Sequence, residues 1–295
     1  MQPLHSRHRH QLQRKKCALS SQWTVAHLED IFPRQPEMSD YWEAAWDGYL
    51  FRSDFFGDVY KILRPYYRCA IEQMALGVQG KAGSDLSRGR LARHLAGLYW
   101  RGVETLEDDG SLIPLFLDSA PDDIRARFVT GLGAELRESK PSADSEEWLR
   151  VKALWEARVR AIVEILGSEG QLTNFVRELS AFTAWVPFIP EDLGDFYPMI
   201  ELSELASENG DAIRLLKFLS SVAQNHAYFV ASLLEKLLRQ ERGPWFLATE
   251  YDTIRTILET AMRSGDEQAK SCAVRVINLF GERGDERYRE LLKPS

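Results

Sequence analysis

The segment that most constrains this chain runs from Ser145 to Leu166, with the sequence SEEWLRVKALWEARVRAIVEIL. Its apolar residues recur at spacings of three and four, which places them in one stripe of a helix: Trp148, Val151, Trp155, Val159, Ile162 and Leu166. Ser145 is a suitable N-cap, and Gly167 is a typical end of a helix. Two tryptophans on one stripe need a deep partner surface. We therefore expect a central helix with Trp148 and Trp155 buried against its neighbours.

The rest of the chain shows the same helical period. Further helices are predicted near residues 23–32, 40–51, 54–74, 88–103, 120–136, 173–186, 195–207, 211–222, 225–240, 250–264, 267–280 and 285–292. We expect a break or kink at Pro65 and a helix start capped by Ser119. No stretch alternates between apolar and polar residues over five positions, so the sequence predicts no strand. The predicted fold class is therefore all-α.

A rough repeat runs through the second half of the chain, where helices of similar length follow in pairs joined by short turns. The segments 250–264 and 267–280 form such a pair, and the second is rich in small residues. Ala269, Ala273 and Val276 would let neighbouring helices approach closely. This pattern is typical of HEAT-like units. Two architectures stay open: a helical-repeat, HEAT-like α-solenoid or an irregular multi-helix array.

The length of the chain and its local composition indicate how it is divided into domains. A chain of 295 residues can bury a sizeable core. Residues 1–22 are polar and His-rich, with five Lys or Arg and no Asp or Glu. Such a segment cannot bury a core, so we expect a disordered basic tail that is dispensable for folding. Residues 23–295 are predicted to form a single α-helical repeat-like domain, with one candidate point of subdivision at residues 138–145.

The charge balance and the cysteine count narrow the partners and the compartment. The net charge is −7, and because residues 1–22 carry +5, the remainder carries −12. An acidic body argues against broad nucleic-acid binding, so we expect at most weak binding through residues 1–22. Cys17, Cys69 and Cys272 lie far apart without a CxxC pair, which is typical of reduced thiols in the cytoplasm. No apolar run approaches the length of a transmembrane helix, so no membrane partner is expected.

The sequence contains no complete catalytic or ligand-binding motif. The segment 75–83 (ALGVQGKAG) is similar to a phosphate-binding loop, but Ala75 replaces its first Gly and Ala82 its Ser or Thr. Carboxylate pairs recur where helix starts and turns explain them: Asp108/Asp109, Asp122/Asp123, Glu146/Glu147 and Glu191/Asp192. His94 and His226 lie on predicted helices beside apolar residues, so we interpret them as structural. We predict no catalytic residue, cofactor, metal ligand or small-molecule substrate.

Aromatic residues are numerous, with eight Trp, ten Tyr and fourteen Phe. One interpretation is core packing between irregular helices. The other is that some of them line a groove that holds a partner, because Trp and Tyr are typical anchors of interfaces. The candidate interaction surface under the second interpretation is Tyr41, Trp42, Trp46, Tyr66, Tyr67 and Trp100.

Several segments of the chain carry a resemblance to a known group of proteins. The segments WTVAHLEDIF (23–32), YWEAAWDGYLFRSDFFGDVYKILRPYY (41–67) and RHLAGLYWRG (93–102) resemble the C-terminal α-helical, HEAT-like region of large bacterial proteins with an upstream sirtuin-like or nucleotide-binding module. The resemblance covers roughly residues 23–240. It implies no catalytic residue here, because the enzymatic module would lie upstream, and only 22 residues precede Trp23. It also implies a link to bacterial defence against phage.

Two functions from different classes follow from these patterns. The first is a non-catalytic helical scaffold or protein-interaction module that binds another protein or a sister domain. The alternative is an enzyme with an unrecognised site, in which His94 or His226 meets acidic residues only in three dimensions. Nucleic-acid binding through the basic tail is a further alternative. The failed motifs and the paired helices favour the first function.

Overall fold

A computed structural model describes residues 23, 25–33, 35–51, 57–75, 85–169, 174–190, 196, 197, 200, 209–240 and 249–293. Within these residues every regular element is a helix, so the all-α prediction is confirmed. The chain divides into two compact units, Met1–Ala120 and Pro121–Ser295. The boundary lies upstream of residues 138–145, which include the end of one helix and its connection to the next helix inside the second unit. The predicted basic tail, residues 1–22, lies outside the described residues.

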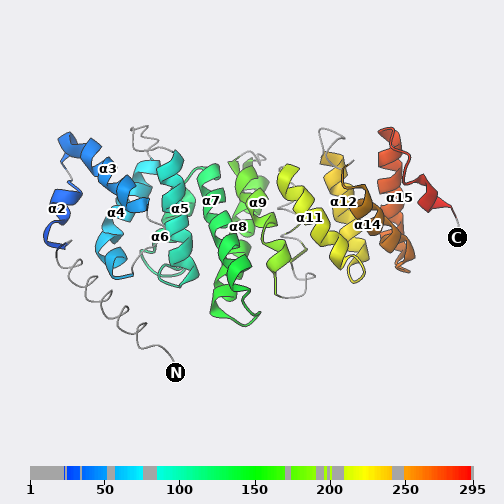
Figure 1. Cartoon of the computed structure of the whole chain (residues 1–295), viewed down its shortest axis with the longest axis horizontal. Helices are drawn as coiled ribbons and strands as arrows, with labels where there is room; N and C mark the ends of the chain where they lie inside the picture. Colours follow the sequence, from blue (N-terminus) through cyan, green and yellow to red (C-terminus); the bar gives the residue numbers. More distant parts are fainter. Residues whose placement is uncertain are drawn as a thin grey trace, which may run out of the picture. The chain divides into compact units, whose positions relative to one another are not determined.

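The first unit is built from helices that pack in two pairs. Its elements are α2 (Leu28–Ile31), η1 (Pro36–Met38), α3 (Ser39–Leu50), α4 (Gly57–Ala75), α5 (Asp85–Trp100) and α6 (Leu112–Ser119). Helix α3 packs against α5, and α4 packs against α6 (Figure 1). The short η1 packs against α3, and Phe32, which follows α2, contacts Trp46 of α3 and Tyr66 of α4.

The structure differs from the sequence predictions at three points in the first unit or at its end. Helix α4 continues through Pro65 instead of breaking there; Pro65 and Lys61 are exposed, so the carbonyl of Lys61 that loses its helical partner can face water. Helix α6 was not expected, and its N-cap is Ser111, whose side chain accepts from Ile113 N. Ser119 is the last residue of α6 and caps nothing, because α7 starts after Pro121.

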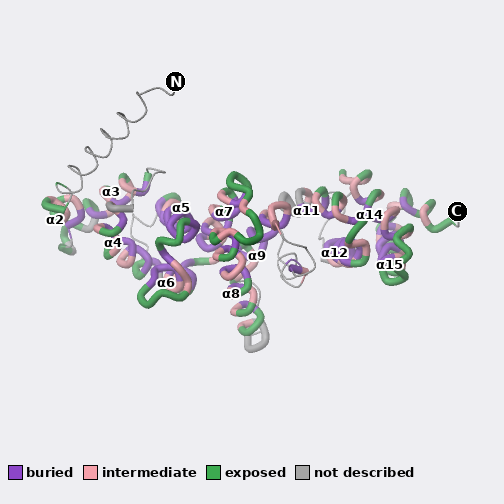
Figure 2. The backbone as a smooth tube through the Cα atoms, turned by 90° about the horizontal axis from the view of Figure 1, so that it is seen from below, coloured by how far each residue is buried: buried purple, intermediate pink, exposed green. Residues whose placement is uncertain are grey.

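Aromatic rings fill the core where α3, α4 and α5 meet. Tyr67 is fully buried, and its ring lies 5.0 Å from that of Trp46 and 5.1 Å from that of Tyr60, both in edge-on contact. Edge-on packing brings the positive ring edge against the negative face, which stabilises such pairs. Figure 2 shows the resulting buried stretch along α5 in purple. The aromatic sequence of this region therefore serves its core.

The second unit contains the longest helix of the described chain. Its elements are α7 (Asp122–Ser139), α8 (Glu146–Glu169), α9 (Val176–Thr183), η3 (Val186–Phe188), α11 (Asn209–Val222), α12 (Ala227–Gln240), α14 (Tyr251–Arg263), α15 (Glu267–Glu282) and η5 (Arg289–Leu292). Helix α7 packs along α9. The apolar residues of α7 that recur every four positions, Ile124, Phe128, Leu132 and Leu136, are all buried. The helix predicted near residues 195–207 lies largely outside the described residues.

Helix α8 confirms the prediction for the central segment. Trp148 and Trp155 are both 0% exposed, and Ser145 caps the helix, since its Oγ accepts from Trp148 N at 3.1 Å. The ring of Trp155 stacks on Phe182 at 5.5 Å and meets Trp185 edge-on at 5.7 Å. The helix ends at Glu169, two residues beyond the expected stop at Gly167.

Two helical hairpins stack at the C-terminal end of the second unit. Helices α11 and α12 form the first hairpin, and α14 and α15 form the second; α11 packs on α14 and α12 packs on α15 (Figure 1). Ala269, Ala273 and Val276 of α15 are all fully buried. In a HEAT-like array, the first helix of each hairpin packs on the first helix of the next hairpin, and the second helix packs on the second. Two hairpins make one such step, so the choice between a solenoid and an irregular array stays a prediction.

A short C-terminal element closes the last hairpin. Tyr288, just before η5, is 1% exposed, and its ring lies 5.1 Å from that of Tyr251 and 4.7 Å from that of Phe280. Arg255 of α14 also pairs with Glu290 at 2.5 Å. Tyr288 therefore packs against both α14 and α15. Among the described helices, none is both long enough and apolar enough to cross a membrane.

Candidate functional site

Five of the six aromatic residues of the predicted interaction surface lie in the core of the first unit. Trp42, Trp46, Tyr66, Tyr67 and Trp100 are 8%, 4%, 2%, 0% and 7% exposed, whereas Tyr41 is 66% exposed. These five side chains are not available to a partner in this structure, and core packing describes them instead. Of the six, only Tyr41 lies at the surface.

The two histidines that the enzyme alternative needs are both engaged by tyrosines. His94 of α5 is 4% exposed, and its Nδ1 lies 2.8 Å from the hydroxyl oxygen of Tyr67. His226, before α12, is hydrogen-bonded through Nδ1 to the hydroxyl of Tyr197. His94 belongs to the first unit and His226 to the second. Within the described residues, no group of three or more His, Cys, Asp or Glu is arranged to hold a metal ion.

The segment that is similar to a phosphate-binding loop lies almost entirely outside the described residues. Apart from Ala75 at the end of α4, residues 75–83 lie outside the described residues. The pair Glu191/Asp192 also lies outside them. Asp122 and Asp123 occupy the first turn of α7, as expected, and Glu146 and Glu147 that of α8.

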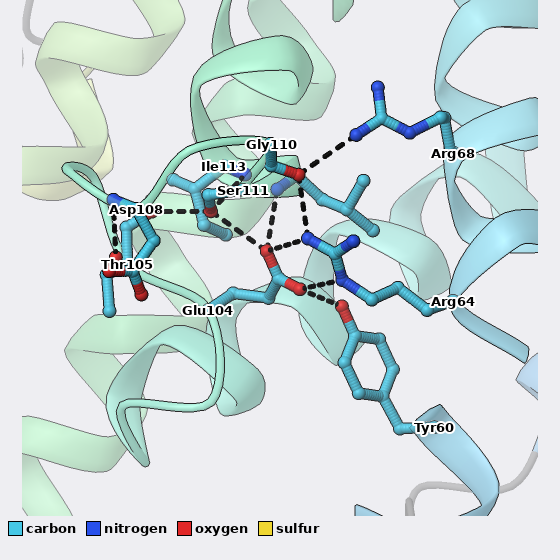
Figure 3. A network of polar contacts seen from close by, with 10 residues as sticks. Tyr60, Arg64, Arg68, Glu104, Thr105, Asp108, Gly110, Ser111 and Ile113 are labelled. Atoms are coloured by element: carbon cyan, nitrogen blue, oxygen red, sulfur yellow. Dashed lines mark hydrogen bonds and ion pairs between the residues drawn. The ribbon is translucent and has the colours of Figure 1, made fainter. Parts of the chain in front are cut away.

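A buried carboxylate, Glu104, organises the polar centre of the first unit (Figure 3). It is 3% exposed and accepts hydrogen bonds from four groups: the Tyr60 hydroxyl, Arg64 Nε at 2.7 Å, Ser111 Oγ at 2.8 Å and Leu112 N at 2.6 Å. Arg64 also donates from Nη2 to the carbonyl of Gly110 at 2.7 Å. The network therefore ties α4 to the loop after α5 and satisfies the start of α6.

The electrostatics of this network favour a charged Glu104. Burial alone would raise the pKa of Glu104, but the hydrogen bonds from Arg64, Tyr60 and Leu112 N outweigh it and lower that pKa. The pKa of Tyr60 is raised, first by burial and then by its hydrogen bond to Glu104. Tyr60 is therefore a neutral donor and Glu104 an ionised acceptor at neutral pH. All of the groups around the carboxylate are donors, so the arrangement holds the fold in place.

The second unit contains a second buried carboxylate, Glu178 of α9. It is 0% exposed and lies between two arginines: Arg125 Nε is 2.5 Å from Oε2, and Arg158 Nε is 2.5 Å from Oε1. Asp122 of α7 accepts from the backbone N of Arg177 at 2.8 Å and of Glu178 at 2.9 Å, which satisfies the start of α9. These pairs join α7, α8 and α9. Sequence reasoning missed both carboxylate networks, because each depends on at least one arginine 40 or more positions away in the chain, Arg64 for Glu104 and Arg125 for Glu178.

One side of α3 is a surface feature that the core does not explain. Tyr41, Ala44, Gly48 and Phe51 are all exposed and are spaced by three, four and three residues, so they form one stripe. Phe51 follows the last residue of α3 and keeps helical angles, with φ −64° and ψ −27°. We call these four residues the α3 outer face. Trp42, Trp46 and Leu50 lie on the opposite side of the helix and are buried.

The α3 outer face combines large and small side chains. Phe51 is 70% exposed and Tyr41 is 66% exposed, the highest values among the exposed large apolar side chains that the structure describes. Between them, a side chain added at Gly48 would meet nothing within 4 Å. The two aromatic rings thus flank a low centre formed by Ala44 and Gly48. Such a profile lets the backbone of another helix approach closely between two aromatic contacts.

Acidic residues border this face on one side. Asp40, Glu43 and Asp47 follow the same spacing of three and four, and α3 contains no Lys or Arg. Asp47 accepts a hydrogen bond from Ser87 Oγ, which joins α3 to α5. At the Phe51 end, the guanidinium of Arg90 lies 4.3 Å from the ring centroid. The face is therefore apolar along its centre and negative along one edge, with one cation at its C-terminal end.

The signal for the α3 outer face is present in the sequence. The spacing 41, 44, 48 and 51 is as regular as the spacing of Trp42 and Trp46. The predicted interaction surface included the two tryptophans, which lie on the buried side of the helix. An amphipathic helix normally shows one apolar stripe. Two apolar stripes on opposite sides of α3 indicate that only one of them faces the core of its own unit.

Comparisons of the chain with protein-family models, with curated proteins and with solved structures found no match. The class of protein is therefore defined by the geometry alone: an all-α protein whose first unit presents an apolar helix face to solvent.

Proposed function

We propose that this protein is a non-catalytic helical docking module and that the α3 outer face binds a helix of a protein partner or sister domain. The observation that carries the proposal is the position of Tyr41 and Phe51 on one stripe of α3, 66% and 70% exposed, with open space at Gly48 between them. Isolated exposed apolar residues are ordinary on protein surfaces, whereas an ordered stripe of them is a feature of binding sites.

The energetics of such a face suit a specific complex. Burying apolar surface is worth roughly 25 cal/mol per Å², and aromatic anchors at the centre of an interface dominate its affinity. Tyr41 and Phe51 are ten positions apart, which separates them by about 15 Å along a helix. A partner helix that crosses α3 at Gly48 would contact both rings. The proposal therefore predicts two anchors and a small-residue crossing point.

The setting of this function is also part of the proposal. The resemblance of residues 23–240 to the helical regions of large bacterial proteins supports a role beside a catalytic module, in a bacterial defence-type system in the cytoplasm. In that setting the chain supplies binding, and its partner supplies any chemistry. The enzyme alternative would instead require turnover that depends on His94 or His226, each of which is hydrogen-bonded to a tyrosine.

The test compares proteins captured by the intact chain with those captured by the double variant Tyr41→Ser/Phe51→Ser. The matched control is Leu149→Ser/Val163→Ser, which removes two exposed apolar side chains of α8, 50% and 51% exposed. A partner identified with the intact chain is then purified, and its affinity for all three proteins is measured. We expect the Tyr41/Phe51 variant to bind at least about tenfold more weakly, as loss of interface anchors does, and the control to bind unchanged.

Two outcomes would overturn the proposal. One is equal affinity of the partner for the intact chain and for the Tyr41/Phe51 variant. The other is nucleotide hydrolysis or nuclease activity that survives purification and is lost in His94→Gln or His226→Gln, which would establish the enzyme instead.

A further inference from the structure

We infer that residues 1–22 of this chain bind the α3 outer face of their own first unit and compete there with the partner. The inference rests on the proposed function of this face and adds its regulation. Two observations carry it: the opposite charges of the two segments, and the covalent link that keeps them close together.

The charges of the two segments are balanced. Residues 1–22 contain five Lys or Arg and no acidic residue. Residues 23–51, which include α2, η1 and α3, contain six acidic residues and one arginine, a net charge of −5. Two of these acidic residues, Glu37 in η1 and Asp40 in the first turn of α3, are exposed. Oppositely charged surfaces attract each other over roughly a Debye length of about 10 Å at moderate salt.

The same segment also supplies apolar contacts. Leu4, Leu12 and Leu19 are distributed through its basic residues. Tyr41 and Phe51 need apolar partners, while Glu37 and Asp40 need cations, and a basic segment with interspersed leucines offers both. Residues 1–22 therefore match both the apolar centre of the α3 outer face and its acidic edge.

The covalent link makes a weak interaction sufficient. Residue 22 directly precedes Trp23, and α3 begins at Ser39 in the same unit. An extended segment of this length spans on the order of 70 Å, far more than the length of α3. A short link of this kind gives an effective concentration in the millimolar range. Residues 1–22 can therefore occupy the face with only millimolar intrinsic affinity, and a tighter partner can displace them.

The experiment measures how fast trypsin cleaves after the basic residues of the segment 1–22 in the full chain. A synthetic peptide of residues 1–22, digested in the same buffer, gives the rate for the unbound segment. Released peptides are followed by mass spectrometry, and circular dichroism checks that each variant is folded. The ratio of the two rates is the protection that binding provides.

At low salt, about 50 mM NaCl, we expect the segment in the full chain to be cleaved several-fold more slowly than the free peptide. Protection should disappear at about 500 mM NaCl, where charges are screened. It should also disappear in Glu37→Lys/Asp40→Lys and in Tyr41→Ser/Phe51→Ser. The control Glu138→Lys/Glu164→Lys changes the net charge equally at exposed sites of the second unit and should keep the protection.

Three results would overturn the inference. They are cleavage at the rate of the free peptide at low salt, protection that persists in Glu37→Lys/Asp40→Lys, and protection that falls on dilution, which would assign the segment to a second copy of the chain. None of these results depends on the partner. The inference can therefore fail while the Tyr41/Phe51 variant still loses its partner, and the docking function can fail while protection is observed.

Discussion

The indole of Trp185 packs directly on the backbone of α7 at Gly133. A methyl group at position 133 would lie 2.9 Å from Cδ1 of Trp185, closer than Cβ atoms approach other heavy atoms in folded proteins, and 3.0 Å from Nε1. The indole Nε1 also donates to the carbonyl of Val129, one turn earlier on α7, at 2.9 Å. Gly133 is thus the residue that allows Trp185 to reach α7.

Gly133→Ala is predicted to destabilise the second unit. Forcing a methyl group against a fully buried ring costs about 1–3 kcal/mol, and the better helix propensity of Ala offsets at most about 1 kcal/mol of that cost. Chemical denaturation measures the difference. The control is Gly48→Ala, which places the same methyl group in open space on α3 and should stabilise that helix by roughly 0.5–1 kcal/mol. A Gly133→Ala protein as stable as the Gly48→Ala protein would contradict the close packing.

The buried Glu178 makes a second prediction. Replacing it with Gln removes the negative charge between Arg125 and Arg158 and leaves two largely buried cations without it. Breaking a buried ion pair from one side typically costs about 3–5 kcal/mol. The measurement is the free energy of unfolding from denaturant titration. Glu164→Gln, at an exposed position on α8, should change it by less than about 0.5 kcal/mol; similar values for the two variants would argue against the network.

The third prediction concerns the packing of α8. Trp155→Ala removes a side chain that contacts Phe182, Trp185 and Phe196 and should destabilise the protein by about 3–5 kcal/mol. Leu149→Ala changes the same helix at a position that is 50% exposed and should be nearly neutral. An unchanged melting temperature for Trp155→Ala would show that α8 is not a packed central helix.

The pH dependence of stability is predicted to report on Glu104. Because the pKa of Glu104 is lower in the folded protein than its ordinary value of 4.5, its contribution is complete above that value. The contribution is lost as the pH falls from 4.5 through the lower folded pKa, where the carboxylate gains a proton. Thermal unfolding of the wild-type protein and Glu104→Gln at several pH values measures the difference.

The difference between wild type and Glu104→Gln should be largest above pH 4.5 and should shrink below it. Glu72→Gln removes one exposed carboxylate from α4, outside the network, and controls for the loss of a charge. If the stability difference between wild type and Glu104→Gln grew as the pH fell, the ionised form of Glu104 would not be the stabilising one.

The sequence determined the helices wherever periodicity and capping chemistry agree. The stripe of α7, the burial of Trp148 and Trp155, and the cap at Ser145 are local properties of consecutive residues, and the structure bears them out. The errors arose where local signals compete. Helix α4 continues through Pro65 because this side of α4 faces solvent. Ser119 does not cap α7, because α7 begins only after Pro121 and Ser119 is the last residue of α6.

The tertiary structure alone decided which apolar stripe of α3 is buried and which acids are paired. Trp42 and Tyr41 are neighbours in the sequence, yet one packs in the core and the other faces water. Glu104 is paired with Arg64, which lies 40 positions away in the chain, and Glu178 is paired with Arg125, which lies 53 positions away. The physical reason is that helix formation depends on near neighbours, whereas burial and charge pairing depend on distant segments that the fold brings together.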